Sequence, residues 1–240
     1  NEQSPQAQFG NIRAVKELRS VANQMGYKRT LSETYGGGGW EVTFKDLKRL
    51  GDWEYVLGVN YMNQHLSHQT LTGARKYDYP PVFTYHSPWW SNYKVLNDYF
   101  ARLSYLLSEG SQENCIAVIE PNSTLWSYYS HTKSNPRLIQ IGESFQAFIT
   151  ALEKSQVEYD LASENIIKDQ GKIVKGKFVI GKAGYSTIIV PPHTENISRH
   201  TFFLLQQFLS EGGRLICFSE PENVDGEKRA ELIGLIRSEK

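Results

Sequence analysis

The chain has 240 residues, of which 40% are hydrophobic and 22% are charged, and its formal net charge at pH 7 is zero. This length and composition predict a globular protein of one large domain or two small ones. The balanced charge argues against nucleic-acid and lipid surfaces, and no apolar run approaches the ~20 residues of a membrane-spanning helix. Because the chain begins at Asn1 without a methionine, we expect a processed product or a piece of a longer protein.

The first predicted elements are a helix and a strand. Apolar residues recur at helical spacing over Asn11–Met25, and Gly26 follows as a C-cap. A strand-like run, Tyr27–Ser32, comes next, and the carboxylate residue Glu33 follows directly at its end. In barrel enzymes, catalytic groups lie at the C-terminal ends of strands. Glu33 is therefore either a catalytic carboxylate or the cap of the following helix, and spacing alone leaves both open.

An unusual glycine run follows Glu33. Gly36–Gly39 are four consecutive glycines, and Trp40 comes directly after them. Glycine permits positive φ and a close approach of the backbone to a ligand. An aromatic ring next to such a loop suits the flat face of a sugar. The alternative is an ordinary surface turn.

The next predicted helix begins at Thr43, with Asp46 at the position that completes a capping box. A strand over Val59–Asn63 follows, and then a long loop to about residue 90 that is rich in aromatic and hydrogen-bonding side chains. Loops of this length in a folded domain are usually functional or disordered, and the aromatic content argues against disorder. A helix over Ser91–Ser108 follows. The predicted order of elements is thus helix, strand, helix, strand, loop and helix. That order is typical of two βα units of a parallel sheet with a leading helix.

His65 and His68 lie three residues apart, just after the second strand. They are interpreted as contacts to a hydroxylated ligand, as zinc ligands lacking an identifiable third partner, or as ordinary loop histidines. Trp89 and Trp90 are expected to pack against the third helix, although one of them could serve as a sugar platform.

Residues 111–240 predict a second α/β unit with a doubly wound sheet. Four apolar runs read as strands, three segments read as helices, and a lysine-rich stretch reads as a hairpin. The predicted strands are Cys115–Ile119, Tyr159–Leu161, Thr187–Val190 and Arg214–Phe218. The predicted helices are Pro136–Lys154, Asn196–Ser210 and Glu227–Ser238. The hairpin is Lys172–Gly184, and residues 122–135 form a polar link.

Several chemistries lack their motifs. The sequence has no nucleotide-binding glycine loop, no C-x-x-C pair and no H-E-x-x-H pair. Cys115 and Cys217 do not lie in a nucleophile elbow, so thiol catalysis is not expected. We expect both to be buried, unpaired and on neighbouring strands.

The order of short motifs nevertheless resembles a known family. Ser32-Glu33-Thr34, the glycine loop, Asp52-Trp53, Gly58-Val59-Asn60 and His65-x-x-His68-Gln69, followed by Pro88-Trp89-Trp90 and Asp98-Tyr99-x-Ala101-Arg102, resemble glycoside hydrolase family 106, the α-L-rhamnosidases. The following unit is similar to the class I glutamine amidotransferase-like domain that follows the barrel in these enzymes and in family 42-type β-galactosidases. The resemblance covers nearly the whole chain.

The resemblance implies a fold and a division into domains. Residues 1–110 would be the last two βα units of a (β/α)₈ barrel, and residues 111–240 an amidotransferase-like accessory domain. Glu33 would be one of two catalytic carboxylates, since glycosidases use a pair, and the partner would lie on an earlier strand. Trp40, Asn63, His65 and His68 would line the sugar site.

The resemblance also implies cofactors, partners and location. No cofactor is expected in this piece, whereas the resemblance implies calcium in the full-length enzyme. The partners would be carbohydrate and the remaining barrel segments, with neither nucleic acid nor membrane, in a bacterial periplasm or outside the cell. The competing hypothesis is a non-catalytic carbohydrate-binding or scaffolding module.

Overall fold

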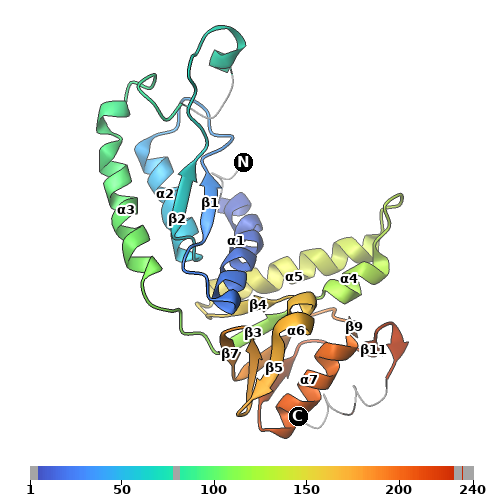
Figure 1. The fold of residues 1–240 in the computed structure, drawn as a ribbon. Helices are drawn as coiled ribbons and strands as arrows, with labels where there is room; N and C mark the ends of the chain where they lie inside the picture. Colours follow the sequence, from blue (N-terminus) through green and yellow to red (C-terminus); the bar gives the residue numbers. More distant parts are fainter. Residues whose placement is uncertain (1–4, 78–81, 230–233, 235–240) are drawn as a thin grey trace. The chain divides into compact units, whose positions relative to one another are not determined.

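The computed structural model describes residues 5–77, 82–229 and 234, and the chain divides into two units (Figure 1). Unit 1 comprises residues 1–22 and 27–111, and unit 2 comprises residues 23–26 and 112–240. Within the described ranges, no helix combines the length and the apolar character needed to cross a membrane.

Unit 1 follows the predicted order of elements. Helix α1 precedes strand β1, helix α2 precedes strand β2, and two short 3₁₀ helices lead into helix α3. Their bounds are α1 Pro5–Met25, β1 Leu31–Thr34, α2 Phe44–Val56, β2 Tyr61–Gln64, η1 Gly73–Tyr77, η2 Trp90–Asn92 and α3 Lys94–Ser108. The last turn of α1 belongs to unit 2, and Gly26 follows it with a φ of +73°, as expected of a C-cap.

Strands β1 and β2 pair in parallel, with Leu31 opposite Tyr61 and Glu33 opposite Asn63. The strand predicted over Tyr27–Ser32 is therefore wrong in its bounds, since pairing begins at Leu31 and includes Glu33. The preceding Thr30 is held by the Asn60 side chain, whose Oδ1 accepts its backbone N–H at 2.9 Å. Side-chain bonding before Leu31 thus sets where the ladder starts.

Helices α2 and α3 supply most of the core of unit 1. Thr43 and Asp46 form the predicted capping box at the start of α2. Leu47 and Leu50 on α2 and Phe100 on α3 are all buried in one cluster. The other side of the strands carries Leu31 and Tyr61, which remain 49% and 51% exposed. One face of this two-stranded sheet is thus buried and the other is open.

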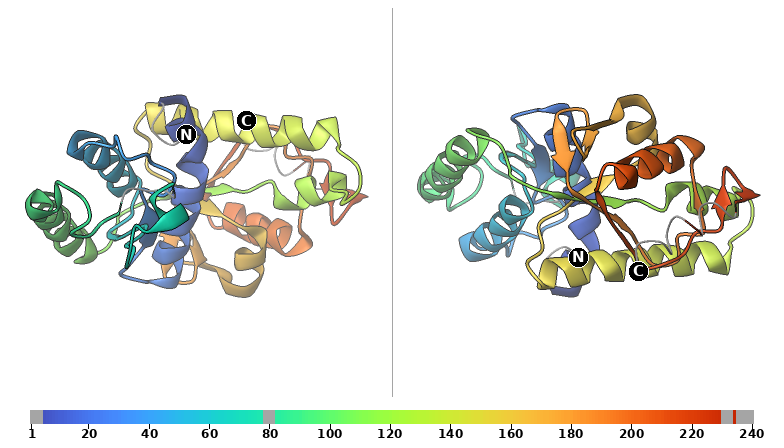
Figure 2. Two further views of the ribbon diagram at one scale, coloured as in Figure 1. Left: turned by 90° about the horizontal axis from the view of Figure 1, so that it is seen from above. Right: turned by 90° about the horizontal axis from the view of Figure 1, so that it is seen from below.

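Unit 2 is built on a four-stranded parallel sheet in the order β10-β8-β3-β4. The views from above and below show α5 on one face of this sheet and α6 and α7 on the other (Figure 2). The main bounds are β3 Ile116–Ile119, β4 Asp160–Ala162, β8 Thr187–Val190, β10 Arg214–Cys217, α4 Asn122–Tyr128, α5 Pro136–Lys154, α6 Glu164–Gln170 and α7 Arg199–Ser210.

Two small sheets complete unit 2. One is antiparallel and joins β5 (Gly171–Val174), β6 (Lys177–Ile180) and β7 (Ala183–Tyr185). The other joins β9 (Asn196–Ile197), β11 (Asn223–Val224) and β12 (Glu227–Lys228).

Both faces of the main sheet are covered by apolar side chains. All four residues of β8 are buried, as expected of a central parallel strand. Helix α5 contributes Ile141, Phe145 and Ile149, each 0% exposed and four residues apart. Helix α7 buries Phe202, Leu205 and Phe208, so this sheet is enclosed within its own unit.

Three predictions for unit 2 were wrong, and one helix was missed. The polar link at residues 122–135 contains α4, and α6 was not predicted at all. The helix expected from Asn196 begins at Arg199, because Asn196–Ile197 pairs with β11 and Ser198 caps the helix. The helix expected from Glu227 begins instead with β12, which pairs with β11. Most of that predicted helix, residues 230–233 and 235–238, lies outside the described residues.

The two cysteines are free, as predicted, but their placement was predicted wrongly. Cys115 is exposed and Cys217 is partly exposed. They are also not on neighbouring strands, because Cys115 adjoins β3, Cys217 ends β10, and β8 lies between these two strands. Cys115 precedes β3, and its carbonyl accepts the N–H of Thr187 at 3.0 Å. Its backbone therefore joins the sheet while its side chain stays outside.

Candidate active site

Glu33 and His65 meet at the C-terminal ends of β1 and β2. The N–H of His65 donates to the carbonyl of Thr34 at 2.9 Å, so the chain stays beside β1 after β2 has ended. Nδ1 of His65 lies 2.7 Å from Oε1 of Glu33, although the ring is not aligned for a hydrogen bond. The side chains are 32% and 57% exposed. The carboxylate is therefore held beside an imidazole and still faces solvent.

Asn63 shares this end of the sheet. It lies directly opposite Glu33 in the parallel register and is exposed. Side chains alternate between the two faces of a strand, so Leu31 and Glu33 share the open face with Tyr61 and Asn63. The predicted neighbourhood of Glu33, Asn63 and His65 is therefore present in the structure. The role of each in binding or catalysis stays a prediction.

The glycine loop is anchored by Tyr35. This residue has a φ of +69°, a left-handed conformation that a bulky residue rarely adopts, and it is 4% exposed. Its hydroxyl donates to the carbonyl of Leu47 at 3.0 Å, and its ring stacks on Phe83. Burial, with smaller effects of Tyr93 and Glu54, raises the pKa of Tyr35. Tyr35 thus acts as a neutral donor that fixes the chain two residues after Glu33.

The glycines themselves lie close to the imidazole. A Cβ placed on Gly36 would be 3.4 Å from Cδ2 of His65, so the His65 ring packs against this backbone. Gly37 has a φ of +78°, where glycine is favoured. Trp40 follows the loop and is 40% exposed.

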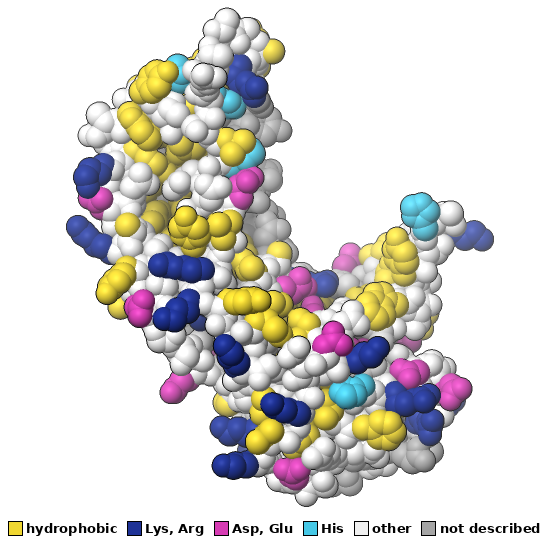
Figure 3. All heavy atoms as spheres, in the orientation of Figure 1, with side chains coloured by type: hydrophobic (Ala, Val, Ile, Leu, Met, Phe, Trp, Pro, Cys, Tyr) yellow, Lys and Arg dark blue, Asp and Glu magenta, His cyan; other side chains and the backbone are white. Residues whose placement is uncertain are grey.

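A pocket of about 380 Å³ opens in the loop after β2. It brings His65 and His68 together, and Trp40 is not among the residues that line it. The lining residues are His65, Leu66, Ser67, His68, Gln69, Thr70 and Arg75. In the space-filling view, histidine side chains of unit 1 gather at one end of the unit together with basic side chains (Figure 3). Arg75 was not singled out from the sequence, where only its place in a loop rich in hydrogen-bonding groups pointed to it.

Hydrogen bonds hold this loop in place. The N–H of Phe83 donates to the carbonyl of Leu66 at 3.3 Å, and Nε2 of His86 lies 3.3 Å from the carbonyl of Gln69. The peptide bond between His65 and Leu66 is cis. The segment around residue 85 is thus hydrogen-bonded to the loop that forms the pocket.

The structure gives other carboxylates of unit 1 different roles. Glu54 was overlooked in the sequence; it is 6% exposed, and its Oε1 accepts the hydroxyl of Ser32 at 3.0 Å. Because Ser32 and Glu33 point to opposite faces of β1, Glu54 lies on the covered side. Asp46 caps α2, and Asp52 pairs with Lys48. Glu33, in contrast, faces the open side at the strand ends.

A metal site is not supported in this part of the protein. Among residues 5–77, 82–229 and 234, no three His, Cys, Asp or Glu side chains group as a metal ion would require. The interpretation of His65 and His68 as zinc ligands thus has no third ligand within the described ranges.

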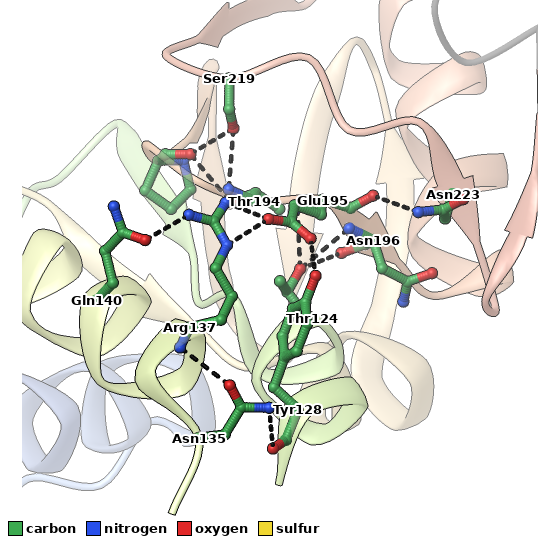
Figure 4. A network of polar contacts seen from close by, with 11 residues as sticks. Thr124, Tyr128, Asn135, Arg137, Gln140, Thr194, Glu195, Asn196, Ser219 and Asn223 are labelled. Carbon is green, nitrogen blue, oxygen red and sulfur yellow. Dashed lines mark hydrogen bonds and ion pairs between the residues drawn. The ribbon is translucent and has the colours of Figure 1, made fainter.

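Unit 2 carries a different polar cluster, after β8 (Figure 4). Glu195 accepts the Tyr128 hydroxyl at 2.5 Å and Nε of Arg137 at 2.8 Å. Burial raises the pKa of Glu195, but the hydrogen bonds of Tyr128 and Arg137 outweigh it and hold that pKa below its usual range. The Thr124 hydroxyl accepts the N–H groups of Glu195 and Asn196 at 3.1 and 3.0 Å. The cluster ties α4 and α5 to the segment after β8.

Comparison with known proteins decides the family. The sequence model of glycoside hydrolase family 106, described as alpha-L-rhamnosidase, matches residues 1–231. The chain belongs to this family. The resemblance seen in the short motifs is thereby confirmed.

The relatives of this family 106 chain are much longer than it is. It is 23% identical over 206 residues to a putative beta-glucuronidase of Formosa agariphila, covering 84% of this chain and 16% of the relative. It also aligns with the structure of a rhamnosidase from Novosphingobium sp. PP1Y with a TM-score of 0.66 and 19% identity. That match covers 95% of this chain and 21% of the other. The mixed α/β architecture with parallel sheets agrees with this fold.

Proposed function

We propose that this chain is part of a family 106 glycoside hydrolase and that Glu33 is one of its two catalytic carboxylates. The single observation that carries the proposal is the placement of Glu33. It is solvent-facing at the C-terminal end of a parallel strand and lies 2.7 Å from His65. Parallel βα barrels build their active sites at that end.

In this proposal, β1 and β2 are the last two strands of a (β/α)₈ barrel. Support comes from what the two strands leave uncovered. Leu31 and Tyr61 are about half exposed on the face that would line the barrel interior. An open groove of about 630 Å³ also runs between β2 and α3, lined in part by Tyr61, Asn97 and Tyr105. A further parallel strand would fit along that side of β2, since neighbouring strands lie ~4.8 Å apart.

Unit 2 is assigned as an amidotransferase-like accessory domain. Numbered along the chain, its parallel strands have the spatial order 2-1-3-4, which is the order of the flavodoxin-like doubly wound sheet. Glu195, which follows β8, is paired with Arg137 and Tyr128. A carboxylate satisfied in this way stabilises the loop and is not poised for catalysis.

The chemistry follows the two-carboxylate scheme of glycosidases. One group protonates the leaving oxygen, and the other activates water or attacks the anomeric carbon. Glu33 supplies one group and an earlier strand of the full-length protein supplies the other. Asn63, His65 and His68 contact the sugar, and Trp40 stacks against it. The substrate is a carbohydrate, an α-L-rhamnoside on the family's description, and the location is the periplasm or the exterior of a bacterium.

The decisive experiment is Glu33→Gln in the full-length protein, assayed on an aryl α-L-rhamnoside. We expect kcat to fall by at least ~10²–10⁴-fold, the range for loss of acid–base catalysis, with substrate binding kept within a few-fold. The amide preserves the shape of the side chain but cannot carry its charge.

Glu41→Gln is the matched control, because Glu41 is also exposed and follows the same glycine loop. Its turnover is expected to stay near the wild-type level. Near-normal turnover of Glu33→Gln would return Glu33 to a structural role. Carbohydrate binding without turnover by the unmodified full-length protein would favour the alternative, a non-catalytic binding module.

A further inference from the structure

One ring nitrogen of His65 is buried without an aligned hydrogen bond. The His65 side chain is 32% exposed, but its Nδ1 atom is shielded from solvent and has no hydrogen-bond partner among the described residues. Buried polar atoms in folded proteins are nearly always hydrogen-bonded, so an exception calls for an explanation. Oε1 of Glu33 lies 2.7 Å from this nitrogen. The distance is therefore already that of a hydrogen bond, and only the orientation is missing.

Backbone contacts fix the His65 ring beside the strands. Its backbone N–H donates at 2.9 Å to the carbonyl of Thr34, the residue after Glu33. A Cβ built on Gly36 would lie 3.4 Å from Cδ2 and 3.6 Å from Cγ of the imidazole, so the ring packs against the glycine backbone on its Cδ2 side. The Nδ1 side of the ring lies against Glu33. The ring is thus held between the glycine loop and the carboxylate.

The Glu33 carboxylate is the partner that can adjust. This side chain is 57% exposed, and the last torsion of a glutamate is broad, so its carboxylate turns readily. Catalytic hydrogen bonds are often poorly aligned in ligand-free proteins and tighten when substrate binds. A small rotation of the carboxylate is enough to bring Oε1 into line with a proton on Nδ1, because the two atoms are already within hydrogen-bonding distance.

We propose that His65 is a positioning residue for Glu33: the Nδ1–H group of its neutral imidazole donates to Oε1 and fixes the direction in which the carboxylate meets the sugar. In the neutral ring, a proton on Nδ1 leaves Nε2 as an acceptor. The same ring then accepts the proton of a sugar hydroxyl through Nε2, in agreement with its place in the lining of the pocket. This inference deepens the proposed function and rests on it for its catalytic meaning.

The test separates the two ring nitrogens of His65. In the full-length protein, His65→Asn places an amide nitrogen near the position of Nδ1, whereas His65→Gln, one carbon longer, places it near the position of Nε2. Both variants lose the packing of the ring against Gly36, so a purely structural role predicts equal effects. Kinetics on an aryl α-L-rhamnoside are measured for both, and urea unfolding checks that each is folded.

We expect His65→Gln to lower kcat by about tenfold to a hundredfold and to keep KM within a few-fold, because a small misplacement of a catalytic group costs rate rather than binding. His65→Asn should keep kcat within a few-fold and raise KM, since it retains the donor to Glu33 and loses the contact of Nε2. The reverse pattern, or equal losses of kcat, would overturn the proposal. If His65→Gln does not fold, a loss of kcat of about tenfold or more in His65→Asn would overturn it alone.

A double variant and a control complete the test. His65→Gln added to Glu33→Gln should lower kcat no further, because the effects of residues that act as a unit do not add; a further loss of about tenfold would count against the proposal. His131 is exposed in the link between α4 and α5, and its Asn and Gln variants are expected to stay within about twofold of wild type. Near-normal turnover of Glu33→Gln alone would contradict the proposed function. Failure of the present inference leaves Glu33→Gln inactive and removes only the contrast between the two His65 variants.

Discussion

The two parallel sheets of this chain differ in how completely they are enclosed. In unit 2, β8 lies between β3 and β10, and all four of its residues are buried. In unit 1, β1 and β2 pair only with each other among the described residues, and Leu31 and Tyr61 remain about half exposed. Parallel sheets are normally covered on both faces. The main sheet of unit 2 is covered within its own unit, and the open face of β1 and β2 supports the proposal that further strands lie beside them.

The carboxylates that follow the strands of the two sheets also differ in how far their charges are compensated. Glu195 in unit 2 is neutralised by Arg137 and hydrogen-bonded by Tyr128. Glu33 in unit 1 is more exposed and has one imidazole beside it. Satisfied charges stabilise a fold, whereas a solvent-facing carboxylate at a strand end is available to a ligand. We therefore expect chemistry in unit 1 and support in unit 2.

The largest expected effect comes from testing the 240-residue chain alone. If unit 1 lacks the strand that carries the second carboxylate, the isolated chain should hydrolyse no aryl glycoside above background. Loss of one acid–base partner alone costs ~10²–10⁴-fold. The measurement is release of nitrophenol, compared with the full-length protein at equal molar concentration. Turnover by the isolated chain would mean that the site is complete without further strands.

A pair of glycine substitutions compares packing in the two units. A Cβ on Gly51 of α2 would lie 2.3 Å from Cζ of Phe100 and 2.9 Å from Cε of Met62. We expect Gly51→Ala to destabilise the full-length protein by about 1–3 kcal/mol through overpacking, despite the better helix propensity of alanine.

Gly142 of α5 is the counterpart in unit 2, since a Cβ there meets nothing within 4 Å. Gly142→Ala should stabilise by about 0.5–1 kcal/mol from propensity alone. Both variants are compared with wild type by urea unfolding. Stabilisation by both would show that α2 and α3 can separate freely in unit 1.

The smallest expected effect concerns acid stability and the Glu195 cluster. The folded-state pKa of Glu195 is held below its usual value, so this carboxylate adds stability at neutral pH. That contribution is lost as the pH falls through the usual glutamate range towards the lowered value. Glu195→Gln should therefore be less stable than wild type at pH 7, and the gap should narrow below about pH 4. A gap that does not change with pH would show that the cluster acts through packing alone.

Local sequence determined the elements whose signals lie within one segment. Asn135 and Pro136 open α5, which spans Pro136–Lys154 as predicted. Thr43 and Asp46 form the capping box of α2, and the apolar run Thr187–Val190 is β8. Caps and buried runs depend on residues that are neighbours in the chain, so pattern alone suffices for them. The family likewise came from motif order, whereas Glu33 was singled out by its place at the end of a strand-like run, and its catalytic role stays a prediction.

Tertiary contacts decided the rest. The seven-residue helix α4 is too short to be stable by itself. It is held through Thr124 and Tyr128 by a loop about 70 positions later. The pairing of Glu227–Lys228 with β11 likewise displaced the start of a predicted helix. The meeting of Glu33 with His65 depends on the register of β1 against β2, and the pocket lined by His65, His68 and Arg75 depends on how its loop closes. Contacts between distant segments carry no periodicity in the sequence, and only the folded chain brings their side chains within reach of one another.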